Sequence, residues 1–94
     1  MKIRYLVWLN YVEDKIAWKH NVTNKEVNEV LQSKPRVFFK KKGDVEGEDL
    51  YNALGRTEAG RYLSIFFIHK GTHDALILSA RDMNGMERKR YGKK

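Results

Sequence analysis

Apolar residues in the first part of the chain recur at helical spacing. Val12 and Ile16 lie one turn apart, and Asn10 ahead of them is a suitable N-cap, so we predict a helix that begins after Asn10 and ends near His20. The preceding apolar stretch, residues 3–9, is too short and too charged for a membrane span or a signal segment. It predicts a buried strand.

A second helix is predicted directly after the first. Asn21 stands where a left-handed residue commonly ends a helix. Thr23 and Glu26 form a Thr-x-x-Glu capping box, and Val22 and Val27 occupy the two positions of a hydrophobic staple. Local chemistry alone therefore predicts two helices joined by a tight turn.

Beyond Pro35 the pattern changes to the alternation and the β-branched and aromatic runs that are typical of strands. A polar, glycine-bearing loop is predicted over residues 41–48, a hairpin turn over 57–60, and a further helix over 83–91. The predicted strands cover residues 36–40, 49–56, 61–69 and 75–81.

This order of elements predicts an α+β fold. We expect an antiparallel sheet of four to five strands, two N-terminal helices and a short C-terminal helix, with the helices on one face of the sheet. A chain of 94 residues has room for one domain, residues 1–94, whose basic tail, residues 88–94, is expected to fray.

Composition narrows the class of partner. The chain has no cysteine, which excludes disulfides and thiolate metal sites and fits a cytoplasmic protein. The spacing of its three histidines suggests no metal site, so we expect neither a metal nor a cofactor. A formal net charge of +7 favours a partner that carries phosphate or carboxylate groups, and we expect no membrane partner.

Three segments, taken together, resemble the BrnT-type toxins. Residues 16–23, Ile-Ala-Trp-Lys-His-Asn-Val-Thr, resemble the Lys-His-Gly-Val-Ser/Thr helix pair of that family. Residues 54–63 resemble its Gly-x-Thr-x-x-Gly-Arg-x-Leu hairpin, and residues 78–91 resemble its ending, Ser/Thr-Ala-Arg followed by Glu-Arg-x-x-Tyr. The three blocks are in register from about Trp8 to Tyr91, nearly the whole chain.

The resemblance implies a fold and a function. BrnT-type toxins are placed in the RelE/ParE superfamily, and their characterised members are ribonucleases that arrest translation. A ribbon-helix-helix antitoxin neutralises them. We therefore expect a metal-independent endoribonuclease that acts on RNA, free or ribosome-bound. The sequence departs from the family pattern in two places. Asn21 replaces the family's usual glycine. Leu9 and Val12 replace the aspartate and lysine that often open the first helix, and this second difference bears on catalytic competence.

Three residues are the catalytic candidates. His20 lies inside a resembling block and suits proton transfer, although a histidine at a helix end also serves as a cap. Arg61 and Arg81 stand at ends of strands that would pair antiparallel, so both guanidiniums would meet at one sheet edge and hold a phosphate. The alternative is that each forms a structural ion pair with Glu58 or Asp82.

A second group is predicted to bind RNA through charge and stacking. It comprises Lys19, Arg56, Arg88, Arg90 and Tyr91. Trp18 is either a core residue or a stacking surface. Two other functions stay open: a non-catalytic module of the same fold that binds nucleic acid or an acidic partner, and an inhibitor of gyrase of the ParE kind.

Overall fold

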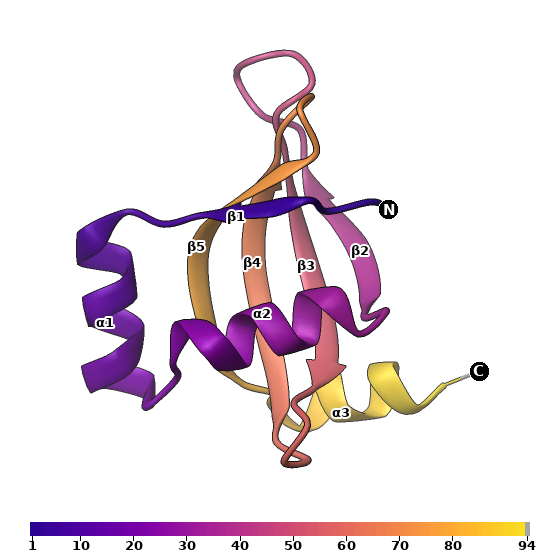
Figure 1. Ribbon diagram of the computed structural model, residues 1–94. Coiled ribbons are helices and arrows are strands. Elements are labelled where there is room, and N and C mark those ends of the chain that lie inside the picture. Colours follow the sequence, from indigo (N-terminus) through magenta and orange to yellow (C-terminus); the bar gives the residue numbers. More distant parts are fainter. Residues whose placement is uncertain (94) are drawn as a thin grey trace.

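The computed structural model describes residues 1–93, which form a five-stranded sheet and three helices. The strands lie in the order β1-β5-β4-β3-β2. Figure 1 shows α1 and α2 beside the sheet and α3 at its lower end. In chain order the elements are β1 (Tyr5–Val7), α1 (Asn10–His20), α2 (Asn24–Gln32), β2 (Arg36–Lys41), β3 (Asp49–Arg56), β4 (Tyr62–His69), β5 (Asp74–Asp82) and α3 (Gly85–Gly92).

The predicted α+β class and the four predicted strands are confirmed, each strand to within one residue at either end. The sheet is mixed, however, and not purely antiparallel. β2 to β5 pair antiparallel in sequence order, whereas β1 runs parallel to β5, with Leu6 opposite Ala75. A short hairpin forces two strands to pair antiparallel, but β1 is joined to the rest of the sheet through two helices. Its direction relative to its neighbour is therefore not fixed by the connection.

The N-terminal strand is also shorter and less buried than predicted. β1 has three residues, and Tyr5 is exposed. From β1 toward the N-terminus the chain crosses the sheet in Figure 1, where Ile3 packs on the core and the carbonyl oxygen of Lys2 lies 2.9 Å from Nε2 of His69.

The junction between the two N-terminal helices follows the predicted local chemistry. Asn21 has φ of 54° and ends α1 in the left-handed region. Thr23 caps α2 in a complete capping box with Glu26. The prediction for the start of α1 was wrong by one residue: Asn10 is already helical, and the N-cap is Leu9, whose side chain has no hydrogen-bonding atom.

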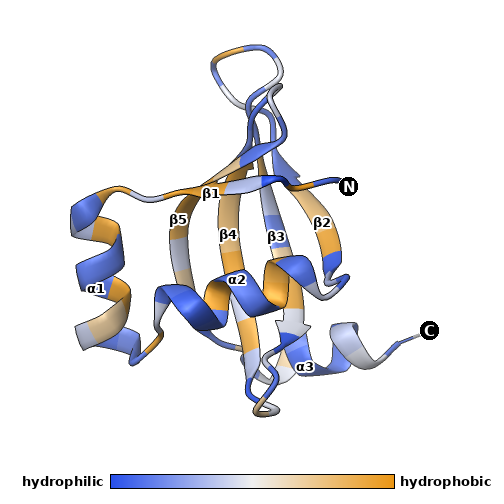
Figure 2. Cartoon of the chain, viewed as in Figure 1, coloured by the Kyte–Doolittle hydropathy of each residue, from blue (hydrophilic) through white to orange (hydrophobic). Residues whose placement is uncertain are grey.

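The core lies between the sheet and the pair α1 and α2. Figure 2 shows the apolar positions gathered along the central strands and on one side of α2. Gly55 lets α2 approach β3, because a Cβ atom there would lie 2.8 Å from Cγ1 of Val30. Each fully buried aliphatic or phenyl side chain contributes about 1.5–3 kcal/mol. The cluster comprises Val12, Ile16, Val22, Val27, Val30, Leu31, Ala53, Leu63, Ile65, Phe67, Ala75, Ile77 and Ala80.

The predicted C-terminal helix is present, but it packs elsewhere than predicted. It was expected over residues 83–91 and covers Gly85–Gly92, and Asn84 and Glu87 form a second capping box at its start. Fraying of the basic tail stays a prediction. The contacts of α3 include Ser64 and Phe38, which lie on the face of the sheet opposite the core. The helices therefore lie on both faces of the sheet, because the short connection after β5 leads the chain to the face opposite α1 and α2. Lys94 lies outside the described residues.

Candidate active site

Arg61, one of the three catalytic candidates, is held by every donor that it has. Its Nε and Nη2 donate to the two carboxylate oxygens of Asp82, at 2.8 and 3.3 Å. Nη1 donates to Glu26 at 3.2 Å and to the carbonyl oxygen of Asn21 at 2.6 Å, and Nη2 to that of His20 at 2.9 Å. The side chain thus joins the end of α1, the start of α2 and the end of β5.

These contacts shift two pKa values. The hydrogen bonds from Arg61 hold the pKa of Asp82 below its ordinary value, and nearby His20 acts in the same direction. The hydrogen bond to Asp82 in turn raises the pKa of Arg61. A cation at the carbonyl end of a helix is also favoured by the helix dipole. The geometry is that of a structural clamp, and Asp82 is the ion-pair partner that the alternative interpretation named.

His20 belongs to this corner of the molecule. It is half-buried at the end of α1, close enough to Asp82 to affect its pKa, and its carbonyl oxygen is bound by Arg61. Lys19 beside it is exposed. Trp18 is 79% exposed, which excludes the core position that the sequence left open.

Arg81 lies on the other face of the sheet. It pairs with Ser64 across β4 and β5, and successive residues of a strand point to opposite faces, so Arg81 and the Asp82–Arg61 pair diverge. The expectation that the guanidiniums of Arg61 and Arg81 meet at one sheet edge is therefore wrong. Strand ends can be adjacent while their side chains are separated by the thickness of the sheet.

A polar network surrounds Arg81. Its Nη1 and Nη2 donate to the two carboxylate oxygens of Glu87, at 2.7 and 3.0 Å. The hydroxyl of Ser64 donates to Glu87 at 2.9 Å, and the buried amide of Asn52 donates to Ser64 at 2.9 Å. Burial disfavours the charged form of Glu87, but Arg81, the backbone N–H of Asn84 and Ser64 together hold its pKa below the ordinary value.

Arg81 and Arg61 differ in the donors that remain. Glu87 takes the Nη1–Nη2 side of the Arg81 guanidinium, and a second Nη1 hydrogen goes to the carbonyl oxygen of Asp82. Within residues 1–93, Nε and one hydrogen of Nη2 of Arg81 have no acceptor. That side of the planar group presents two parallel donors, the arrangement that matches two phosphate oxygens.

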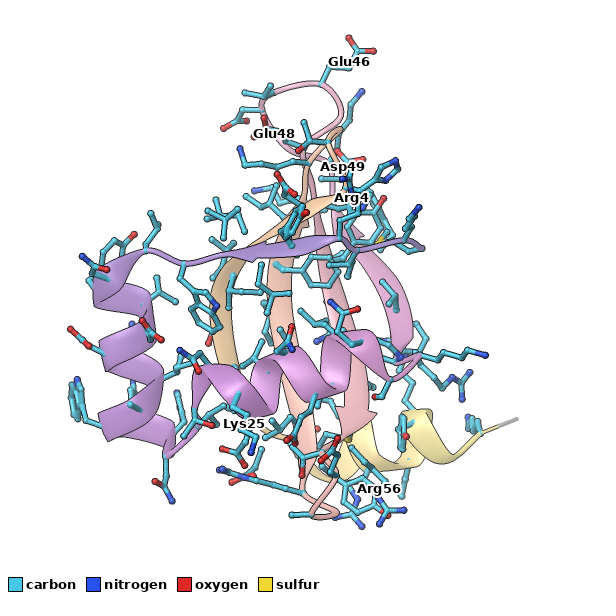
Figure 3. All side chains as sticks on the ribbon, in the orientation of Figure 1. Arg4, Lys25, Glu46, Glu48, Asp49 and Arg56 are labelled. Carbon is cyan, nitrogen blue, oxygen red and sulfur yellow. The ribbon has the colours of Figure 1, made fainter. Side chains whose placement is uncertain are left out.

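The same face carries an aromatic and cationic cluster at its lower end. The guanidiniums of Arg88 and Arg56 lie over the ring of Tyr62, at 3.7 and 4.9 Å from its centroid, and Tyr91 meets that ring edge-on at 5.9 Å. Figure 3 shows Arg56 beside α3 at this end of the sheet. Stacked guanidiniums and tyrosines are surfaces on which nucleic acid bases stack.

A pocket of about 630 Å³ opens beside this cluster, between α3 and the sheet. Asn52 and Glu87 line it together with four cationic side chains, Lys40, Lys89, Arg90 and Lys93. The guanidinium of Arg90 also lies 3.7 Å from the ring centroid of Phe38. The excess of positive charge suits an anionic ligand, and the carboxylate among these cations can accept a proton from that ligand.

The eight predicted residues thus divide between two places. Lys19, His20 and Arg61 lie at the end of α1, whereas Arg56, Arg81, Arg88, Arg90 and Tyr91 lie on the α3 face. Sequence reasoning missed Glu87, Ser64, Asn52 and Tyr62. Glu87 had a signal, since it stands three residues after Asn84 as in a capping box, but nothing in the sequence indicates that its carboxylate also binds Arg81.

Residues 1–93 show neither a membrane-spanning helix nor a metal-binding cluster. None of the helices in this range is both long and apolar enough to cross a membrane. Nor do residues 1–93 contain a group of three His, Cys, Asp or Glu side chains that could hold a metal ion.

Comparisons with known proteins give an informative likeness among solved structures. No family model matches the sequence, and no curated protein matches it. Among solved structures, the 1.1 Å crystal structure of the Brucella abortus ribonuclease toxin BrnT is similar, with a TM-score of 0.67 and 17% sequence identity. The match covers 85% of this chain and 96% of the toxin chain. The protein therefore has the fold of the BrnT ribonuclease toxin.

Proposed function

We propose that the protein is a toxin-type endoribonuclease whose active site is the pocket under α3. The observation that carries the proposal is the Arg81–Glu87 pair at a pocket rich in positive charge, in a chain with the fold of a ribonuclease toxin. Membership of the RelE/ParE superfamily, which the sequence resemblance implies, is part of this proposal.

Each side chain has a role in cleavage by the 2′-hydroxyl. The free side of Arg81 binds the scissile phosphate and stabilises the charge that develops on it. Glu87 is ionised at neutral pH and accepts the proton of the attacking 2′-hydroxyl. An ammonium group of the pocket, Lys40 or Lys89, protonates the leaving 5′-oxygen. Ser64 and Asn52 hold the carboxylate in place.

The remaining basic residues bind the substrate. Arg56, Arg88 and Tyr91 surround Tyr62 and provide a stacking surface next to the pocket. His20 and Arg61, which were catalytic candidates, receive other roles in this proposal. Arg61 is a structural clamp, and His20 is the helix-end residue that it holds.

A cognate antitoxin would neutralise the enzyme by covering this surface. The pocket and its surroundings carry arginine and lysine side chains, so a segment that presents carboxylates is complementary to them. We propose that the antitoxin is a ribbon-helix-helix protein, as the resemblance implies, and that the pair acts in the cytoplasm. Free or ribosome-bound RNA is the substrate.

Cleavage of RNA tests the proposal directly. The purified protein, free of antitoxin, is expected to cut single-stranded RNA in the presence of EDTA, because the acid, the base and the charge stabilisation all come from side chains. The products should carry 2′,3′-cyclic phosphate ends, which electrophoresis and end-labelling detect. Activity that required an added divalent metal would contradict this mechanism. Tight RNA binding without cleavage of free or ribosome-bound RNA would favour the non-catalytic module.

A further inference from the structure

The outer side of α1 carries two large aromatic residues in water. Tyr11 is 70% exposed and Trp18 is 79% exposed. They are seven residues apart and so lie two turns from each other on the same side of the helix. Val12 and Ile16, by contrast, are buried against the sheet. Figure 1 shows α1 at the margin of the molecule, with its outer side facing away from the sheet. Single exposed apolar residues are common, whereas exposed aromatic residues grouped on one side of a helix are typical of an interaction site.

Two charged residues lie between the aromatics on the same side. Asp14 and Lys15 are exposed, and neither takes part in an ion pair within the described part of the chain. The stripe therefore has the order aromatic, acid, base, aromatic, with its centre between Asp14 and Lys15. Turning the helix end over end about that centre puts Tyr11 on the place of Trp18 and Asp14 on the place of Lys15.

Such a stripe is complementary to itself. In a dimer with two-fold symmetry, if residue i contacts residue j of the partner, then j contacts i. Two antiparallel α1 helices would place Tyr11 of each chain against Trp18 of the other. Asp14 of each would then face Lys15 of the other, so that two aromatic contacts flank two ion pairs of the correct sign.

We propose that the outer stripe of α1, Tyr11, Asp14, Lys15 and Trp18, is the interface of a symmetric dimer of this chain. An RNA strand fits the stripe less well, because Asp14 would repel its phosphates. One helix of 11 residues gives a small interface, so the dimer should be weak and concentration-dependent. The interface lies apart from the pocket under α3, and the proposal does not depend on ribonuclease activity.

Sedimentation velocity on charge-swapped variants tests this interface. Over a concentration series from about 1 μM to about 1 mM, the wild type should pass from monomer to dimer. Trp18→Ala should raise the dimer Kd by at least about 30-fold. Asp14→Lys and Lys15→Asp should each raise it by roughly tenfold, because each creates two like-charge contacts. The double variant Asp14→Lys/Lys15→Asp restores opposite charges and should return to within about threefold of the wild type.

Lys25→Asp is the matched control, since it reverses an exposed charge at the start of α2 outside the stripe (Figure 3) and should leave the dimer Kd unchanged. Circular dichroism confirms that each variant is folded. A protein that stays monomeric throughout the series would overturn the proposal. So would a dimer whose Kd is unchanged in the three single variants, or a double variant that dimerises as weakly as the single charge reversals. Loss of RNA affinity in a monomeric Trp18→Ala variant would assign the stripe to RNA instead.

Discussion

Replacing Arg81 with alanine should reduce the rate constant of RNA cleavage by about two to three orders of magnitude. The free Nε–Nη2 side of this guanidinium lies next to Glu87, which lines the pocket, and is the group best placed to hold the scissile phosphate. Loss of one charge-stabilising donor costs about 2–4 kcal/mol in the transition state. The rate constant should be measured under single-turnover conditions with saturating protein, so that weaker substrate binding does not contribute.

Two further variants separate this role from a structural one. Arg81→Lys keeps the charge beside Glu87 but loses the planar pair of donors, so it should remain nearly as stable as the wild type and still cleave slowly. Lys41→Ala removes a cation from the far end of β2, outside the pocket lining, and should leave the rate unchanged. If Arg81→Ala cleaved at the wild-type rate, or lost activity only in proportion to unfolding, its catalytic role would be refuted.

Replacing Arg61 with alanine should act on stability. The side chain donates to the carboxylates of Asp82 and Glu26 and to two carbonyl oxygens at the end of α1. A hydrogen bond to a charged group contributes about 1.5–3 kcal/mol to stability. The side chain of Asp82 is 65% exposed, so its ion pair with Arg61 contributes less to the free energy of unfolding than a buried pair would. We expect a loss of about 2 kcal/mol in the free energy of unfolding, or roughly 10 °C in Tm for a domain of this size.

The effect of Arg61→Ala should depend on pH in a definite direction. The folded pKa of Asp82 is depressed, so its contribution to stability is fully present above its unfolded pKa, about 3.9, and is lost as pH falls through the folded value. The stability difference between wild type and variant should therefore be constant near neutral pH and narrow in acid. Cleavage per folded molecule should stay within a few-fold of wild type. A stable but inactive Arg61→Ala protein would return Arg61 to the catalytic residues.

Local signals in the sequence predicted the parts of the fold that depend on neighbouring residues. The capping box of Thr23 and Glu26, the left-handed Asn21 and the four long strands are all decided by side chains within a few positions of one another. A strand was predicted where β1 lies, but its partner and direction could not be predicted in the same way. Its parallel pairing with β5 joins residues almost seventy positions apart and leaves no mark in the local pattern.

The candidate site shows the same division. The residue types were informative, since five of the eight predicted residues do gather on one face. The predicted proximity of Arg61 to Arg81 was wrong, because it was inferred from the positions of the strand ends alone. It ignored the alternation along β5 that sends Arg81 and Asp82 to opposite faces. The side of the sheet on which α3 packs depends on the turn after Asp82. That turn brings Glu87 to Arg81, a contact that the sequence spacing alone does not specify.

Mapping an RNA analogue on the protein by NMR tests most directly where the functional surface lies. A 2′-O-methyl oligonucleotide cannot be cleaved by the 2′-hydroxyl route, so it can be titrated into ¹⁵N-labelled protein without turnover. We expect the largest chemical-shift changes at Ser64, Arg81 and Glu87 and along α3. Changes concentrated instead at His20, Arg61 and the start of α2, with the α3 face unaffected, would contradict the proposed site.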